Sequence, residues 1–299
     1  MPARTATLLA ALRSAFWAGA AWALAACAPA PAPAASEPAL WRIADQDSEI
    51  WLYGSVHVLP PELVWRGPQF EAAFAAAEEV VLEVDASENF DALMAQYGTL
   101  PAGEALSGLL DAPSRARLAR IAQELRVDPA TLARARPWLA AVWLSVAYAE
   151  AHGHTAAAGV DAVLEAQARA SGKRLAFLET PEQQIRVLAE LSLEDELRFL
   201  AVTLREIDEG ADSLAAIDAA WVRGDVETLA ALLDAQWREA GPGIHDALIV
   251  RRNRSWTAEI ARRLDGSGRV FYAVGAAHLV GRDSVVAMLR ARGIEVEGP

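Results

Sequence analysis

Short apolar runs alternate with amphipathic stretches along this chain, which is the pattern of a protein that combines strands with helices. Nearly continuous apolar runs predict buried strands over residues 49–55, 80–85, 174–180 and 269–275. A strand over residues 41–45 should form a hairpin with the first run, and residues 294–297 predict a last edge strand. Helical periodicity occupies most of residues 90–172 and 183–264. We therefore predict an α/β fold in which a mixed central β-sheet has flanking helices and two helical insertions.

The first 26 residues predict a bacterial lipoprotein signal peptide. Arg4 and Arg13 precede an uncharged stretch over residues 14–26, which is too short to span a bilayer as a mature helix. That stretch ends in Leu-Ala-Ala-Cys, and Cys27 is the only cysteine of the chain. We expect cleavage before Cys27 and lipidation of its thiol, which would anchor the protein in the cell envelope, facing the periplasm and in the outer membrane. An ordinary cleaved signal with a chance cysteine is the alternative.

Composition bounds the rest of the chain. Residues 27–39 are rich in proline and alanine, which predicts an extended tether, and residues 40–299 suffice for a single large domain. The formal net charge is −13. A chain this acidic is a poor partner for nucleic acid or an anionic lipid surface. We expect no nucleic-acid partner, a peptide or small-molecule substrate, and membrane contact only through the lipid anchor.

Four predicted strands end in side chains that can bind a metal or move a proton. The strings Gly-Ser-Val-His and Gly-Ala-Ala-His close the first and last apolar runs and end in His57 and His278. Glu83 and Asp85 end the second run, and Glu179 lies at the end of the third. Ligands bind at the carboxyl ends of strands in open α/β sheets. The repeated glycine and histidine spacing therefore predicts one shared site.

Two neutral histidines and a carboxylate leave coordination positions open for water, as a hydrolytic zinc, manganese, cobalt or iron site requires. A second carboxylate is then free to act as a general base, and an arginine can hold an oxyanion or a substrate carboxylate. Glu83 is preferred over Asp85, which would otherwise cap the helix after its strand. Whether Glu83 or Glu179 is the ligand stays open. A lone histidine at a strand end is more often structural, but the repeated setting favours a site for His57 and His278.

Other polar residues have simpler explanations. His152 and His154 predict a polar loop, with a second metal site as the alternative. Asp161 is expected to cap or brace the helix that follows it. The arginine-rich string around Arg252 and Asn253 would ordinarily form a solvated helix face.

Six strings identify a family resemblance that covers nearly all of residues 41–299. They are WLYGSVHVLP, VVLEVD, GVDAVLEAQARASGKRLAFLETPEQQ, WVRGD, RRNRSW and VGAAHLVGRDSV, in this order. Together they resemble the bacterial TraB/GumN family. That family is related to the Tiki proteins of animals, which are membrane-associated metal-dependent proteases. It is also similar in fold to erythromycin esterases and to a haem-binding lipoprotein group.

The resemblance implies particular site residues and a function. By position it places metal ligands at His57, Glu83 and His278, a second strand-end glutamate at Glu179 and a helical arginine at Arg252. We predict a lipid-anchored, metal-dependent hydrolase, most plausibly a peptidase, in which Glu179 activates water and Arg252 orients the substrate. The alternatives are a non-catalytic lipoprotein that binds a peptide or tetrapyrrole, and a scaffold of an envelope or exopolysaccharide system.

Overall fold

The structure, a computed structural model, describes residues 37–85, 90–210 and 212–299. The predicted signal peptide, Cys27 and most of the predicted tether lie outside these residues. Within the described ranges no helix combines the length and the hydropathy that crossing a membrane requires.

A five-stranded sheet in the order β1-β2-β5-β3-β4 forms the centre of the fold. The strands are β1 (Leu40–Ala44), β2 (Ser48–Ser55), β3 (Glu79–Val84), β4 (Arg174–Glu179) and β5 (Gly268–Gly275). β1 pairs with β2 in an antiparallel hairpin, and the pairs β2–β5, β5–β3 and β3–β4 are parallel. The predicted α/β class, with a mixed sheet and flanking helices, is confirmed.

The predicted edge strand at the C-terminus is wrong. Glu297 alone forms a bridge, in which it exchanges two backbone hydrogen bonds of 3.0 and 2.9 Å with Arg42 of β1. Gly298 then adopts a positive φ of 88°, which is not a strand conformation, and lies against Leu40 of β1. Pro299 follows and has no N–H group to continue a ladder.

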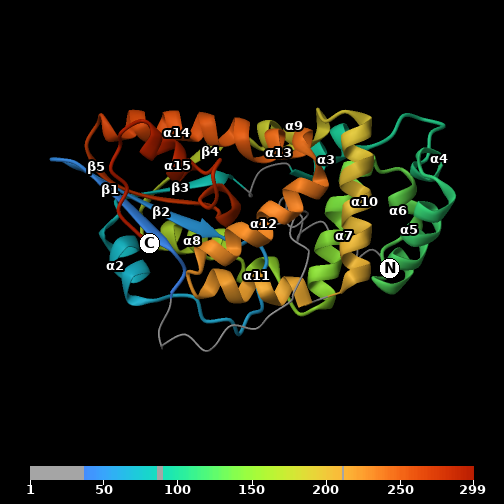
Figure 1. Cartoon of the computed structure of the whole chain (residues 1–299), viewed down its shortest axis with the longest axis horizontal. Helices are drawn as coiled ribbons and strands as arrows, with labels where there is room; N and C mark the ends of the chain where they lie inside the picture. Colours follow the sequence, from blue (N-terminus) through green and yellow to red (C-terminus); the bar gives the residue numbers. More distant parts are fainter. Residues whose placement is uncertain (1–36, 86–89, 211) are drawn as a thin grey trace.

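Both faces of the sheet are covered, which explains why its strands are apolar along almost their whole length. Because side chains alternate along a strand, Trp51 and Tyr53 of β2 join the larger core on one face, and Ile50 and Leu52 join a second core on the other. Trp256 belongs to the second core. Figure 1 shows α14 (Arg251–Leu264) and α15 (Val285–Ala291) on one side of the sheet and α2 (Pro68–Ala76) and α8 (Val160–Ala170) on the other.

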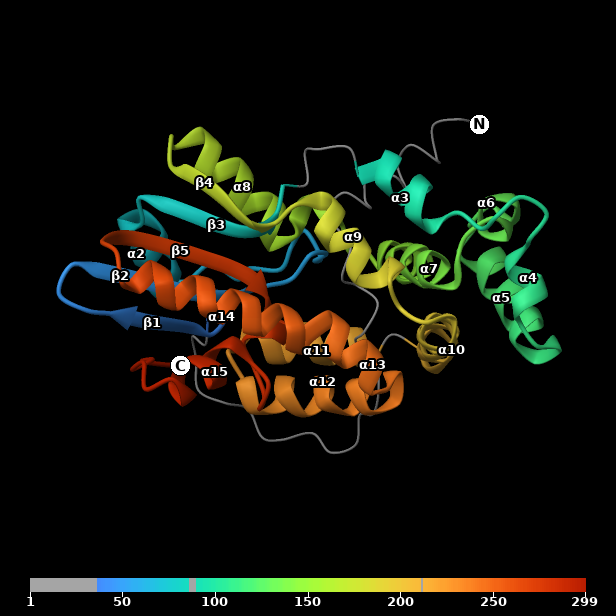
Figure 2. The same cartoon turned by 90° about the horizontal axis from the view of Figure 1, so that it is seen from above.

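Two helical insertions separate the parallel strands. The helices before β4 are α2 (Pro68–Ala76), α3 (Phe90–Gly98), α4 (Leu106–Leu109), α5 (Ala112–Glu124), α6 (Pro129–Ala133), α7 (Pro137–Ala151), the 3₁₀ turn η1 (Ala156–Ala158) and α8 (Val160–Ala170). Those after β4 are α9 (Pro181–Ala189), α10 (Leu193–Glu209), α11 (Asp212–Val222), α12 (Val226–Ala240), α13 (Pro242–His245), the π-helical turn η2 (Asp246–Val250), α14 (Arg251–Leu264), η3 (Ala276–His278) and α15 (Val285–Ala291). Of these elements, α2 precedes β3 and both η3 and α15 follow β5, so the two insertions consist of α3 to α8 and of α9 to α14. Figure 2 shows α5, α6, α7 and α10 beyond the end of the sheet toward which β2 and β5 point. The insertions therefore enclose the carboxyl ends of the strands.

Candidate functional site

The parallel strands bring the predicted site residues to one edge of the sheet. Ser55 of β2 pairs with Gly275 of β5, so the two segments that carry the histidines leave the sheet side by side. Glu83 lies near the end of β3, and Glu179 is the last residue of the neighbouring β4. Strand ends separated by more than two hundred positions in the sequence thus meet in one place.

The glycines of the two Gly-x-x-His strings allow the strings to pack together. A methyl group on Gly54 would lie 3.0 Å from Ala276 in the second string, which leaves no space for a side chain. A methyl group on Gly275 would lie 3.2 Å from Glu83 Oε1, 3.4 Å from His278 Cδ2 and 3.8 Å from His57 Nε2. Gly275 is therefore the point around which the two histidines and Glu83 converge.

His57 is held by Asp161, which sequence reasoning had assigned to a helix cap. Asp161 lies in the first turn of α8, and its Oδ2 is 2.6 Å from His57 Nδ1. Gly159 makes this approach possible, because a methyl group there would lie 2.1 Å from the backbone oxygen of His57. His57 Nε2 is buried and has no hydrogen-bond partner in the described part of the chain. The Nδ1–H therefore donates to Asp161, and the lone pair of Nε2 is free.

The electrostatics of this pair favour a polarised imidazole. Burial opposes the charged form of His57, but the charge and hydrogen bond of Asp161 outweigh it and raise the pKa of His57. Burial likewise works against the carboxylate of Asp161, yet His57 holds the pKa of Asp161 below its ordinary value. The side chains of His57 and Asp161 are only 12% and 20% exposed, so solvent screens their interaction weakly.

His278 has an equivalent arrangement with different partners. Its Nδ1 is 2.6 Å from the side-chain oxygen of Asn253, so Nδ1–H donates to the amide and Nε2 carries the lone pair. Nε2 accepts a hydrogen bond of 2.9 Å from Arg252 Nη1. Burial, with the guanidinium charge added to it, lowers the pKa of His278 to about 3. Asn253 is wholly buried and fixes the tautomer of His278, a role that the arginine-rich string did not reveal.

Glu83 lies between the histidines. Gly275 N donates to its Oε1 at 2.6 Å, Arg252 Nη2 donates to its Oε2 at 2.7 Å, and Oε1 is 3.9 Å from His278 Nε2. Burial opposes its charge, but Arg252 and the two histidines together hold the pKa of Glu83 below its ordinary value. Glu83 is therefore an ionised, buried carboxylate next to both imidazoles.

Arg252 occupies the centre of the site instead of a solvated helix face. Its guanidinium donates to both oxygens of Glu179, at 2.6 and 2.8 Å, and its Cζ lies 4.3 Å from the ring centroid of Trp256. The π-helical turn η2 directly precedes α14, and Arg252 and Asn253 at the start of α14 are both buried. Such turns recur at functional sites because they re-aim side chains. Burial raises the pKa of Glu179 even against this ion pair.

The donor atoms suit a transition metal in type and tautomer. Both histidines present Nε2 lone pairs while their Nδ1–H groups bind oxygens, which is how metal-bound histidines are usually oriented. Among the described residues no three His, Cys, Asp or Glu side chains already stand as a complete metal-binding group. The guanidinium of Arg252 is the reason, because it binds both Glu83 and His278 and places a positive charge where a cation would lie. The residues fit a metal provided that Arg252 withdraws from His278.

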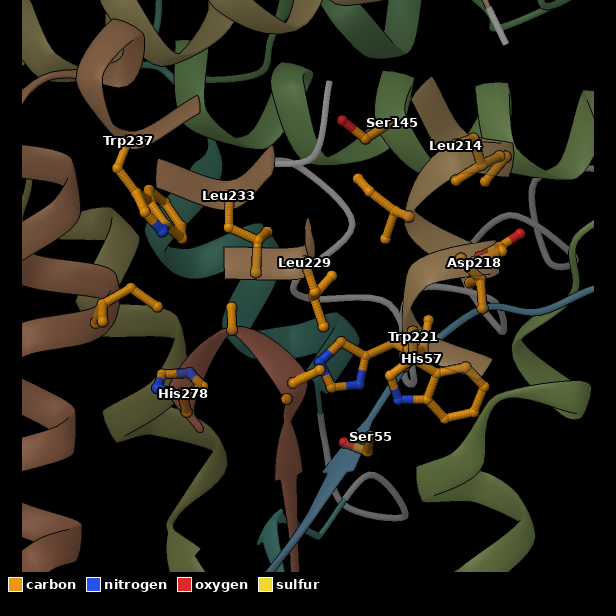
Figure 3. Close-up of a pocket in the computed structure, with 18 residues that line it drawn as sticks. Ser55, His57, Ser145, Leu214, Asp218, Trp221, Leu229, Leu233, Trp237 and His278 are labelled. Atoms are coloured by element: carbon orange, nitrogen blue, oxygen red, sulfur yellow. The ribbon is translucent and has the colours of Figure 1, made fainter. Parts of the chain in front are cut away.

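A cavity of about 120 Å³ opens in front of the histidines. His57 and His278 line one side of it, and α7, α11 and α12 contribute the other walls, as Figure 3 shows. We call it the apolar pocket, and its eighteen lining residues are Ser55, Val56, His57, Val58, Ser145, Ala149, Leu214, Ile217, Asp218, Trp221, Leu229, Leu233, Trp237, Ile249, Gly275, Ala276, Ala277 and His278. Glu83, Glu179 and Arg252 are not among these residues and lie behind the histidines.

Three of the remaining candidates bond to residues other than His57, Glu83 and His278. Asp85 is 3.6 Å from Arg169, so it takes part in an ion pair with α8. His152 stacks on Tyr148 at a ring distance of 4.1 Å. His154 is buried and bonds to Asp218 at 2.7 Å, which makes it part of the packing between α7 and α11.

Comparison with known proteins gave a family and distant relatives. The family model described as TraB/PrgY/gumN family matches residues 39–298. A protein of Escherichia coli strain K12 named "Uncharacterized protein YbaP" is 26% identical over 239 residues, which covers 80% of this chain and 87% of that protein. A protein of the same name from Shigella flexneri matches equally. No solved structure matched the chain.

Proposed function

This chain belongs to the TraB/PrgY/gumN family, and from that membership we propose that it is a metal-dependent hydrolase of the bacterial cell envelope that acts on peptides. The observation that carries the proposal is the shared orientation of two imidazoles. His57 and His278 follow two neighbouring parallel strands, and each has its Nδ1–H bound by a side-chain oxygen. Glu83 Oε1 is 3.9 Å from His278 Nε2, and a methyl group on Gly275 would lie 3.2 Å from that oxygen and 3.8 Å from His57 Nε2. A purely structural role for each histidine does not account for the same arrangement being present twice around one carboxylate.

We assign the metal ligands to His57, Glu83 and His278. Two imidazoles and one carboxylate suit Zn²⁺, Mn²⁺, Co²⁺ or Fe²⁺. Glu83 is preferred to Glu179 because its Oε1 is 3.9 Å from His278 Nε2, whereas Glu179 lies beyond the guanidinium of Arg252. When bound, such a metal would lower the pKa of a bound water and polarise a substrate carbonyl.

Glu179 and Arg252 have complementary roles in the proposal. Glu179 would accept the proton of the attacking water through one oxygen that Arg252 releases while it holds the other, and the rise of its pKa through burial is the direction that a base working near neutral pH requires. Arg252 keeps its hold on Glu179 and, once released from His278, directs Nη1 toward the substrate carbonyl oxygen. Asp161 and Asn253 keep the two imidazoles in the required tautomer.

The proposed location in the envelope comes from the N-terminal residues. Lipidation at Cys27 would hold the domain on the periplasmic side of the outer membrane. Labelling of cells with a radioactive or clickable fatty acid tests this point. The wild-type protein should carry the label and Cys27→Ser should lose it, whereas labelling of both would contradict lipidation at Cys27.

Metal content tests the core of the proposal. We expect the protein purified without chelator, or incubated with Zn²⁺, Mn²⁺, Co²⁺ or Fe²⁺, to hold about one metal ion per chain, and His57→Ala/His278→Ala to hold none. Glu83→Gln should lose metal, whereas Glu179→Gln should keep metal but lose hydrolysis of a mixed peptide library. The absence of metal uptake by the wild-type protein under all these conditions would overturn the proposal.

A further inference from the structure

Aliphatic and indole side chains form most of the apolar pocket. Ile217 and Trp221 of α11 face Leu229, Leu233 and Trp237 of α12 across it. Figure 3 shows Leu229, Leu233 and Trp237 above the end of β2, with His57, His278 and Trp221 along the lower side of the pocket. An occupant of this pocket would contact hydrocarbon and aromatic surface on most sides.

The polar atoms of the pocket do not favour a charged occupant. Asp218 is the only carboxylate among the lining residues, and its Oδ2 is bound by the buried His154 at 2.7 Å. Ser145 has a buried hydroxyl, which Figure 3 shows on the far side of the pocket from His278. Away from the two histidines, a charged group would lose its hydration without gaining an opposite charge, which is costly in an apolar space. The pocket therefore selects an uncharged, apolar group.

The size of the pocket limits the occupant further. Its volume is about 120 Å³, whereas an apolar cavity of roughly 150 Å³ holds one benzene molecule. Sites for drug-sized ligands have volumes of about 300–1,000 Å³. The pocket thus suits one side chain of the size of leucine or phenylalanine.

We propose that the apolar pocket receives one apolar side chain of a peptide substrate, next to the bond that is cleaved. This inference rests on the proposed hydrolase function and adds a specificity to it. It follows from the position of His57 and His278, which both line the pocket, so that an occupant is anchored next to the proposed reacting groups. Leucine, phenylalanine and tyrosine should be preferred at this position over glycine, lysine and glutamate.

Binding of small amino-acid amides tests the pocket without any turnover. We expect N-acetyl-L-phenylalaninamide and N-acetyl-L-leucinamide to bind the purified protein at least about tenfold more tightly than N-acetylglycinamide or N-acetyl-L-lysinamide. Calorimetry and a rise of the melting temperature are the readouts. Equal affinity for the phenylalanine and glycine compounds would overturn the inference.

Two substitutions connect this binding to the pocket. Leu214→Trp, at a partly exposed lining position, should fill the pocket and abolish selective binding. Leu233→Ala should enlarge the pocket and shift the preference from leucine toward tryptophan. Leu232→Ala is the matched control, because Leu232 is the adjacent residue of α12 and is partly buried but does not line the pocket. Unchanged selectivity in both Leu214→Trp and Leu233→Ala would refute the assignment.

Peptide cleavage separates this inference from the proposed function. A peptide library should show cleavage next to apolar residues, with a preference that changes in Leu233→Ala. Cleavage without such a preference would overturn the pocket assignment while leaving the hydrolase intact. Selective amide binding that Leu214→Trp abolishes, with no cleavage of any peptide, would support the pocket and refute the hydrolase.

Discussion

Replacement of Asp161 by asparagine tests whether the Asp161–His57 pair prepares His57 as a metal ligand. The substitution keeps the shape of the side chain and leaves an amide oxygen that can still accept from His57 Nδ1–H. It removes only the negative charge that lies 2.6 Å from that nitrogen. The tautomer of His57 should therefore survive, whereas the basicity of Nε2 should fall.

The expected magnitude follows from the nature of the hydrogen bond. Bonds to a charged group contribute about 1.5–3 kcal/mol and neutral ones about 0.5–1.5 kcal/mol. Both side chains are mostly buried, so little of the difference is screened. A loss of about 1.4 kcal/mol corresponds to about a tenfold weaker metal affinity. Mutation of a residue that binds a metal ligand typically weakens metal affinity by about 10- to 100-fold, so the expected loss lies at the lower end of that range. Asp161→Ala should lie at the upper end of that range.

Competition with a chelating dye measures the zinc affinity of each variant. Glu165→Gln is the matched control, because Glu165 lies on the same helix, α8, and pairs with the exposed Arg169 at 2.7 Å. We expect Glu165→Gln to bind zinc as the wild type does and Asp161→Asn to bind about tenfold more weakly. Wild-type affinity in Asp161→Asn, or an equal loss in both variants, would refute the assigned role of Asp161.

Three further predictions follow from buried groups. Gly275→Ala should displace the carboxylate of Glu83, because its methyl group would lie 3.2 Å from Oε1, and should therefore weaken zinc binding in the same dye assay. Gly108→Ala is the control and should leave zinc binding unchanged, because its methyl group would meet nothing within 4 Å. Burial raises the pKa of Glu206 well above its ordinary 4.5, so folding takes up a proton and the free energy of unfolding should fall as the pH rises from 4.5 through the folded-state pKa. Urea unfolding at pH 5 and pH 8 should show this loss in the wild type, about 1.4 kcal/mol for each unit by which the pKa is raised, and should not show it in Glu206→Gln. The same change in the free energy of unfolding between pH 5 and pH 8 in both proteins would contradict the prediction. Arg252→Ala should destabilise the fold by about 3–5 kcal/mol, because it leaves buried carboxylates without their partner; urea midpoints close to the wild type would contradict that.

The sheet edge was predictable from the sequence because strand periodicity and strand ends are local features. The apolar runs located β2, β3, β4 and β5, and parallel pairing then required their carboxyl ends to meet. The last edge strand was wrongly predicted, because residues 294–297 have the apolar alternation of a strand but only Glu297 pairs with β1. Alternation shows which side chains can be buried and does not show which backbone groups pair.

The partners of the histidines were less accessible to sequence reasoning. Asp161 lies 104 residues from His57, and its position in a helix start gave it a sufficient local explanation. Asn253 was obscured by the arginines around it, because inward and outward positions are not separable until the π-helical turn before α14 is known. The string Gly159-Val160-Asp161 was the available signal, because its glycine is needed for the close contact with the backbone of His57.

The buried charges of the site explain why Arg252 stands where a metal is proposed. Glu83, Glu179 and Asp161 bring three carboxyl groups to one region, and Arg252 brings one permanent positive charge. Carboxylates at this depth require compensation, because each unpaired charge loses its hydration. One guanidinium shared by two glutamates meets only part of that requirement, and an ion that displaced it from His278 would leave its bonds to Glu179 intact. Arginine and metal are therefore compatible occupants of neighbouring positions in the same negative site.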